Sequence, residues 1–196
     1  MLAKIAGGSL KESAVTVLNT DGINFNAFLP LFGKKGLSFP VAVLTDGDAS
    51  RIGDPPSATA TGLKTKEADI PNLRVEYSEI TFEHDLARSA GILPLMLDAF
   101  EILHPVKGKS LKATIGALDS QDKKADAFRD AFIETRTSKG SFAQELAALL
   151  EASGLQREAV PNYILAAFIF LGVVKPEGKN EQAGSPAGAN PVSKSH

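Results

Sequence analysis

A seven-residue apolar run at residues 39–45 (FPVAVLT) constrains the fold more than any other part of this 196-residue chain. The run does not alternate with polar residues, which is typical of a strand buried on both faces in a parallel sheet. Residues 73–80 (LRVEYSEI) do alternate and predict a strand nearer an edge, and residues 14–18 (AVTVL) predict a short strand before both. A helix is expected at residues 24–32. This order predicts an α/β fold with a mostly parallel sheet flanked by helices.

The second half of the chain is predicted to be helical. Its apolar residues recur at helical spacing over four segments, at residues 85–103, 123–134, 141–152 and 160–174. Residues 175–196 hold almost no apolar side chains and many Gly, Pro, Ser and Asn residues. Such a segment buries too little surface to offset its ordering entropy, so we expect a disordered tail. The folded domain is therefore expected to span residues 1–174.

Composition limits the chemistry that the chain can perform. There is no cysteine, so any metal must be held by oxygen ligands or by the three histidines. The absence of disulfides suits the cytoplasm, and no segment approaches the ~20 apolar residues of a bilayer span, so no membrane partner is expected. The net charge of −2 argues against a broadly basic nucleic-acid binder. It leaves open an enzyme that meets phosphates through metal ions.

The candidate site is the sequence Asp46-Gly47-Asp48, which directly follows the apolar strand. Ligands of α/β sheets bind outside the carboxyl ends of the strands. Carboxylates at positions i and i+2 of an extended chain point to the same side, and Mg²⁺ commonly takes one or two carboxylates with waters and phosphate oxygens. Gly47 would let the backbone turn and a substrate approach closely.

Three other interpretations of this cluster compete with a metal site. Asp-Gly is also typical of a β-hairpin, but residues 49–56 (ASRIGDPP) offer no returning strand. An EF-hand loop would need glycine and glutamate where Arg51 and Ser57 stand. A strand followed by Asp-x-Asp also opens the haloacid-dehalogenase-type phosphatases, in which Asp46 would be a nucleophile, and this alternative stays open.

Two further segments could complete the site. Glu83 and Asp85 follow the strand at residues 73–80, so they are expected at the same sheet edge as Asp46, although Asp85 could equally begin a helix. Lys139 stands just before an amphipathic helix, where the helix dipole disfavours a cation. A residue that breaks a local rule is often functional, and a lysine here could stabilise charge on a phosphate. The alternative is a solvated surface lysine.

Three stretches together resemble the Toprim domain of the OLD (overcoming lysogenization defect) family nucleases. They are PVAVLTDGD at residues 40–48, ITFEHDLA at 80–87 and SKGSFAQELA at 138–147, supported by the turn at 19–25 and the final helix. The resemblance implies a Toprim-like α/β core with a helical insertion and metal-dependent cleavage of DNA. It implies that Asp46, Asp48 and Glu83 bind two Mg²⁺ or Mn²⁺ ions, and that Lys139 assists catalysis at the phosphate.

One departure from the family pattern affects the expected activity. A Toprim domain begins with a strand that carries a glutamate and a glycine, and no such strand precedes Ala14. An ATPase domain, which OLD proteins carry upstream, is expected in a longer form, and a homo-oligomer is possible. The chain is therefore expected to be either an OLD-type endonuclease region or a non-catalytic Toprim remnant that serves in metal binding or assembly.

Overall fold

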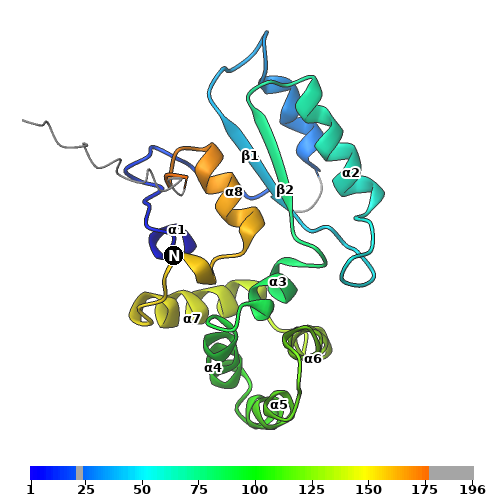
Figure 1. Cartoon of the computed structure of the whole chain (residues 1–196), viewed down its shortest axis with the longest axis vertical. Coiled ribbons are helices and arrows are strands. Elements are labelled where there is room, and N and C mark those ends of the chain that lie inside the picture. The colour runs from blue at the N-terminus through cyan, green and yellow to red at the C-terminus, as the bar shows by residue number, and fades with distance from the viewer. Residues whose placement is uncertain (21–23, 177–196) are drawn as a thin grey trace, which may run out of the picture.

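The computed structural model describes residues 1–20 and 24–176, and it has a small sheet at one end and a group of helices at the other (Figure 1). The strands are β1 (Val41–Thr45) and β2 (Leu73–Tyr77). The α-helices are α1 (Leu2–Ile5), α2 (Ala58–Thr65), α3 (Phe82–Arg88), α4 (Leu93–Leu103), α5 (Pro105–Gly116), α6 (Gln121–Glu134), α7 (Lys139–Ala152) and α8 (Asn162–Phe170). Short 3-10 helices are η1 (Asn24–Ala27), η2 (Leu29–Leu31), η3 (Lys66–Ala68) and η4 (Arg157–Ala159).

The sheet confirms the predicted α/β fold. β1 and β2 pair in parallel, in a register that runs from Val41 opposite Leu73 to Thr45 opposite Tyr77. In Figure 1 the two strands run between α2 and α8, so helices flank the sheet as expected. The buried residues of one face, Val43 and Val75, pack against Leu63 of α2 and the neighbouring η2. Hydrophobic packing on this side therefore holds the crossover helix on the strands.

Three details of the predicted strand region are wrong. β1 is not buried on both faces, because Leu44 is 39% exposed. Residues 14–18 form no strand, since β1 and β2 pair only with each other among the described residues and a strand needs a neighbour for its backbone groups. Residues 24–32 form η1 and η2 instead of one α-helix, because Pro30 lacks an N–H and its ring clashes with the preceding turn.

The helical half follows the predicted segments with two differences. The segment predicted at 85–103 is divided into α3 and α4, and α4 has a proline in its first turn, a position where proline is favoured. Two helices, α2 and α5, were not predicted. The buried side of α5 is formed by Gly108, Leu111 and Ile115 only, so its apolar pattern is weak. A Cβ atom at Gly108 would lie 2.4 Å from the Cα of Glu101 on α4, so glycine allows the two helices to approach closely here.

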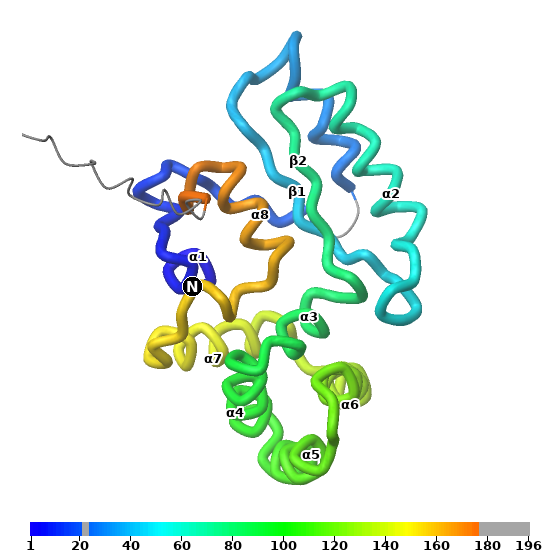
Figure 2. Tube along the Cα trace, in the orientation of Figure 1, coloured from blue at the N-terminus to red at the C-terminus, as the bar shows by residue number. Residues whose placement is uncertain are grey.

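The core has a large helical part and a smaller part that joins distant segments. In the helical part, Met96, Phe100 and Phe128 are fully buried among α3 to α7. In the smaller part, α1 packs against α8 and the residues that follow it (Figure 2). Residues 177–196, which include most of the predicted tail, lie outside the described residues. Across residues 1–20 and 24–176, no helix is both long and apolar enough to cross a bilayer.

Candidate functional site

The candidate site lies at the carboxyl ends of β1 and β2, where backbone hydrogen bonding continues past the strands. The Ser78 N–H donates to the Thr45 carbonyl at 3.1 Å, and the Asp48 N–H donates to the Ile80 carbonyl at 2.8 Å. Gly47 lies between these contacts. A Cβ atom at Gly47 would lie 2.1 Å from the Ser78 carbonyl oxygen, so only glycine allows the two segments to approach this closely.

Asp46 is held in place by groups from the segment that follows β2 and from the start of α3. Its Oδ1 accepts a hydrogen bond from the Phe82 N–H at 2.8 Å and a longer one from the Ser78 hydroxyl at 3.4 Å. Ser78 is fully buried, and its Oγ also accepts from the Gly47 N–H at 3.3 Å. Ser78 is a positioning residue that the sequence alone did not indicate. Because Asp46 and Ser78 lie 32 positions apart, no local pattern links them.

The environment of Asp46 favours a cation. Burial raises the pKa of its carboxyl group above the ordinary value, while the Phe82 N–H opposes this rise, and the nearby carboxylate of Glu83 adds to it. An ionised carboxylate that has lost part of its hydration is stabilised by a positive partner. Asp46 therefore has the oxygen chemistry and the setting that suit a hard divalent ion.

Glu83 and Lys139 meet beside Asp46. The Lys139 ammonium lies 2.7 Å from Glu83 Oε1, and Glu83 is largely buried whereas Lys139 is mostly exposed. The hydrogen bond to Glu83 raises the pKa of Lys139, and its charge also interacts with Asp46. Lys139 is in the first turn of α7, where the helix dipole is unfavourable for a cation. The nearby Glu83 carboxylate offsets this unfavourable interaction. The structure thus brings together Asp46, Glu83 and Lys139 from three separate elements.

Asp48 lies with Asp46 in the lining of a small hollow. It lies beyond the end of β1 with a left-handed φ of 53° and is exposed. With Asp46 it lines a hollow of about 300 Å³, whose other walls include Leu18, Asn19 and Phe25. Within residues 1–20 and 24–176, no three His, Asp or Glu side chains form a group that could hold a metal. The assignment of Asp46, Asp48 and Glu83 as metal ligands therefore stays a prediction.

Asp85 has a structural role in this region. Its Oδ2 accepts a hydrogen bond from the Glu79 N–H at 2.9 Å, which ties the start of α3 to the end of β2. Glu79 in turn pairs with Arg88, and Arg88 Nε donates to Asp122 on α6 at 3.0 Å. Unlike Asp85, Glu83 pairs with Lys139 and its charge acts on Asp46, so Glu83 is the stronger candidate for the site.

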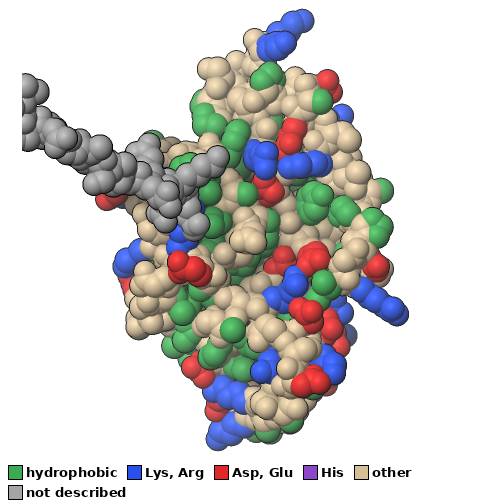
Figure 3. All heavy atoms as spheres, viewed as in Figure 1, with side chains coloured by type: hydrophobic (Ala, Val, Ile, Leu, Met, Phe, Trp, Pro, Cys, Tyr) green, Lys and Arg blue, Asp and Glu red, His purple; other side chains and the backbone are tan. Residues whose placement is uncertain are grey.

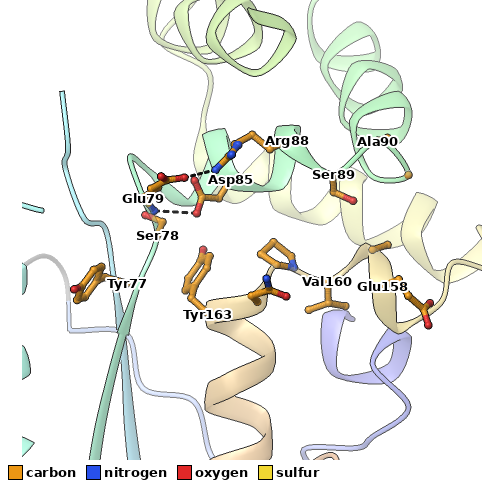
Figure 4. Close-up of a pocket in the computed structure, with 14 residues that line it drawn as sticks. Tyr77, Ser78, Glu79, Asp85, Arg88, Ser89, Ala90, Glu158, Val160 and Tyr163 are labelled. Carbon is orange, nitrogen blue, oxygen red and sulfur yellow. Dashed lines mark hydrogen bonds and ion pairs between the residues drawn. The ribbon is translucent and has the colours of Figure 1, made fainter. Parts of the chain in front are cut away.

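A pocket of about 790 Å³ adjoins the site between the end of β2, α3 and the start of α8 (Figure 4). Tyr163 points from α8 toward Ser78 and Asp85, and its hydroxyl oxygen is buried. Burial raises the pKa of Tyr163, and the negative charges of Asp85 and Asp46 raise it further. The phenol therefore stays protonated, and it places a neutral donor beside the acidic residues.

Part of this site lies in a segment that is similar to a known protein family. Residues 1–48 match the model of the overcoming lysogenization defect protein-like TOPRIM domain. This match agrees with the resemblance seen in the stretch at residues 40–48, whereas the stretches at 80–87 and 138–147 lie outside it. The matched segment ends on Asp48. No curated protein and no solved structure matches the chain.

The matched segment contains β1 and the Asp46-Gly47-Asp48 cluster, whereas Glu83 and Lys139 lie beyond it. The fold brings these later residues to the end of the matched strand. On the face shown in Figure 3, Lys and Arg side chains are interspersed with Asp and Glu and form no continuous basic patch. This face therefore offers a phosphate separate local cations and no broadly positive surface.

Proposed function

We propose that this chain provides the metal-binding carboxylates and the lysine of a Mg²⁺- or Mn²⁺-dependent DNA endonuclease of the OLD type, acting in the cytoplasm. The observation that supports it best is the position of Asp46. This residue lies at the end of the TOPRIM-matched strand, and the Glu83–Lys139 pair comes within interaction distance of it.

Each residue has a distinct part in the proposed chemistry. Asp46 and Asp48 would hold one ion, and Glu83 would contribute to a second. Bound divalent ions stabilise the attacking and leaving oxygens of phosphodiester hydrolysis. Lys139 would donate from its ammonium group to a phosphate oxygen, which offsets charge that develops there. Ser78 and the Phe82 N–H would keep the Asp46 carboxylate oriented.

Metal affinity provides the first test. Calorimetric titration of the chain with Mn²⁺ is expected to show binding that weakens at least about tenfold in Asp48→Ala, because few other oxygen ligands are available. Asp54→Ala is the matched control, since Asp54 is an exposed aspartate of the same loop. Equal affinity of the wild-type chain and Asp48→Ala would contradict the proposed ligand.

Nicking of supercoiled plasmid with Mn²⁺ provides the second test. We expect weak activity from the 196-residue chain, because the described carboxylates form no three-ligand group. Lys139→Ala should lower the nicking rate by about a hundredfold, the cost typical of losing one charge-stabilising donor. Lys123→Ala is the control, since Lys123 is an exposed α6 lysine that pairs with Asp119, just ahead of the same helix. Equal loss in both variants would refute a specific role for Lys139.

A non-catalytic metal-binding or assembly role is the second candidate, and it is favoured because no three His, Asp or Glu side chains of residues 1–20 and 24–176 form a group that could hold a metal. Mn²⁺ binding that depends on Asp48, without any nicking, would support this role over the nuclease. A phosphatase with Asp46 as nucleophile would instead hydrolyse a phosphomonoester and form a covalent adduct at Asp46.

A further inference from the structure

A chain of three hydrogen bonds joins two parts of the helical half. His104 stands between α4 and α5, and its Nε2 lies 2.9 Å from Thr137 Oγ1 in the linker between α6 and α7. Thr137 Oγ1 lies 2.6 Å from Thr135 Oγ1, which donates to the Ala131 carbonyl at 2.8 Å. Thr137 is buried, so these contacts are shielded from solvent.

The proton positions in this chain follow from counting donors. A threonine hydroxyl has one proton, and that of Thr135 is given to the Ala131 carbonyl. Thr137 must then donate to Thr135. With its own proton used, Thr137 can only accept from His104, so His104 Nε2 must carry a hydrogen. The arrangement in which Thr135 donates to the Ala131 carbonyl thus requires a hydrogen on His104 Nε2, whereas donation from Thr135 to Thr137 would require the other tautomer.

The α6–α7 linker, which these hydrogen bonds hold in place, leads directly to Lys139. Arg136 adopts a left-handed φ of 51°, which a non-glycine residue keeps only when its surroundings enforce it. The Thr137 N–H donates to the Phe132 carbonyl at 3.2 Å, and Ser138 then caps α7 through its Oγ. Lys139 is the first residue of that helix, so the linker conformation decides where its side chain begins.

We propose that His104 is a positioning residue for Lys139. Its Nε2–H, acting through Thr137, locks the α6–α7 linker in the conformation from which Lys139 reaches Glu83. The structural part of this inference stands on its own, and only its catalytic consequence rests on the proposed nuclease function.

Nuclear magnetic resonance tests the structural part without any need for activity. Long-range ¹H–¹⁵N spectra are expected to show the Nε2–H tautomer for His104, and an Nδ1–H tautomer would overturn the inference. The Lys139 pKa, measured from its Cε signal, is expected to fall toward the ordinary lysine value in His104→Ala and Thr137→Val. His104→Gln should restore it, because its amide N–H can donate to Thr137.

Thr114→Val is the matched control, since its hydroxyl donates to a backbone carbonyl in α5, away from the linker. Exchange of the Thr137 amide should accelerate roughly fivefold in His104→Ala and Thr137→Val, as for the loss of one hydrogen bond, and not in Thr114→Val. Unchanged exchange and an unchanged Lys139 pKa would overturn the inference.

Kinetics test the catalytic part. If the wild-type chain nicks DNA, His104→Ala should lower kcat with KM unchanged, and His104→Gln should recover the rate. An active enzyme whose kcat is insensitive to His104→Ala would overturn the positioning role in catalysis. A wild-type chain with no nicking would count against the proposed function alone, because the tautomer and the Lys139 pKa still decide the positioning of Lys139.

Discussion

Gly47 and Ser78 lie where the segments after β1 and β2 come closest, and this contact sets the position of Asp46. Gly47 leaves room for the Ser78 carbonyl, and the Ser78 side chain contacts both Gly47 and Asp46. Two residues without metal-binding chemistry of their own thus orient the carboxylate. The site consequently depends on backbone packing as well as on its charged groups.

Gly47→Ala is expected to lower the free energy of unfolding by about 1–3 kcal/mol, as overpacking a close contact does. The new Cβ would meet two backbone oxygens, those of Ser78 and Glu79, which cannot move independently of the strand pairing. Urea unfolding provides the measurement. Gly62→Ala in α2 is the control, because a Cβ added there would have no atom within 4 Å and alanine favours a helix. Equal effects of both substitutions would contradict the close-contact explanation.

The raised pKa of Asp46 predicts a pH-dependent stability difference in the absence of metal. A carboxyl group whose pKa is higher in the folded state than its ordinary value of 3.8 binds protons more tightly when folded. Its stabilising contribution is present below that value and is lost as the pH rises through the folded-state pKa. Asp46→Asn does not titrate, so its unfolding free energy should rise relative to wild type as the pH is raised from about 3 to about 7.

Urea unfolding in EDTA at the two pH values would measure this difference, with Asp54→Asn as an exposed control in the same loop. A relative stability of Asp46→Asn that stays constant or falls with pH would contradict the assigned effect of burial. Metal binding therefore needs the ionised form of Asp46, whereas the protonated form is the more stabilising one in the metal-free protein.

At the scale of elements, local patterns predicted the strands that have partners. The apolar run at 39–45 contains β1, and the alternating run at 73–80 contains β2. Both runs form strands because each is hydrophobic and each has the other as its pairing partner. Residues 14–18 have the same β-branched composition but pair with no described strand, and Val17 and Leu18 are exposed. β-propensity alone does not form a strand without a neighbour.

The candidate site was only partly predictable for the same reason. Asp46 and Asp48 follow a strand and Lys139 breaks a helix-terminus rule, so each has a signal in its own segment. Ser78 and His104 have none, because each acts on a residue more than 30 positions away. The helices α2 and α5 were missed because few of their residues are buried, and an apolar period is then hard to detect.

At the scale of the whole molecule, the buried residues of the described ranges 1–20 and 24–176 form three hydrophobic clusters. Residues 177–196 lie outside these ranges. From the low apolar content of that segment, we expect truncation after Pro176 to leave the thermal midpoint within experimental scatter. Thermal unfolding of the truncated and full-length chains is the measurement. A truncation that instead removed residues 173–176 as well should destabilise the protein, because Val173 and Val174 are buried. A drop of several degrees after the first truncation would place residues 177–196 in the folded domain.

The packing of α1 against α8 has a consequence for synthesis. Residues 1–6 leave the ribosome well before residues 160–174, which form the surface that buries Ala3 and Ala6. The helices between them bury Met96, Phe100 and Phe128 among themselves. Because segments whose contacts lie within themselves can fold as they emerge, the nascent chain should form its helical half before the two ends meet. Helix α1 is therefore without its packing partner until residues 160–174 have been synthesised.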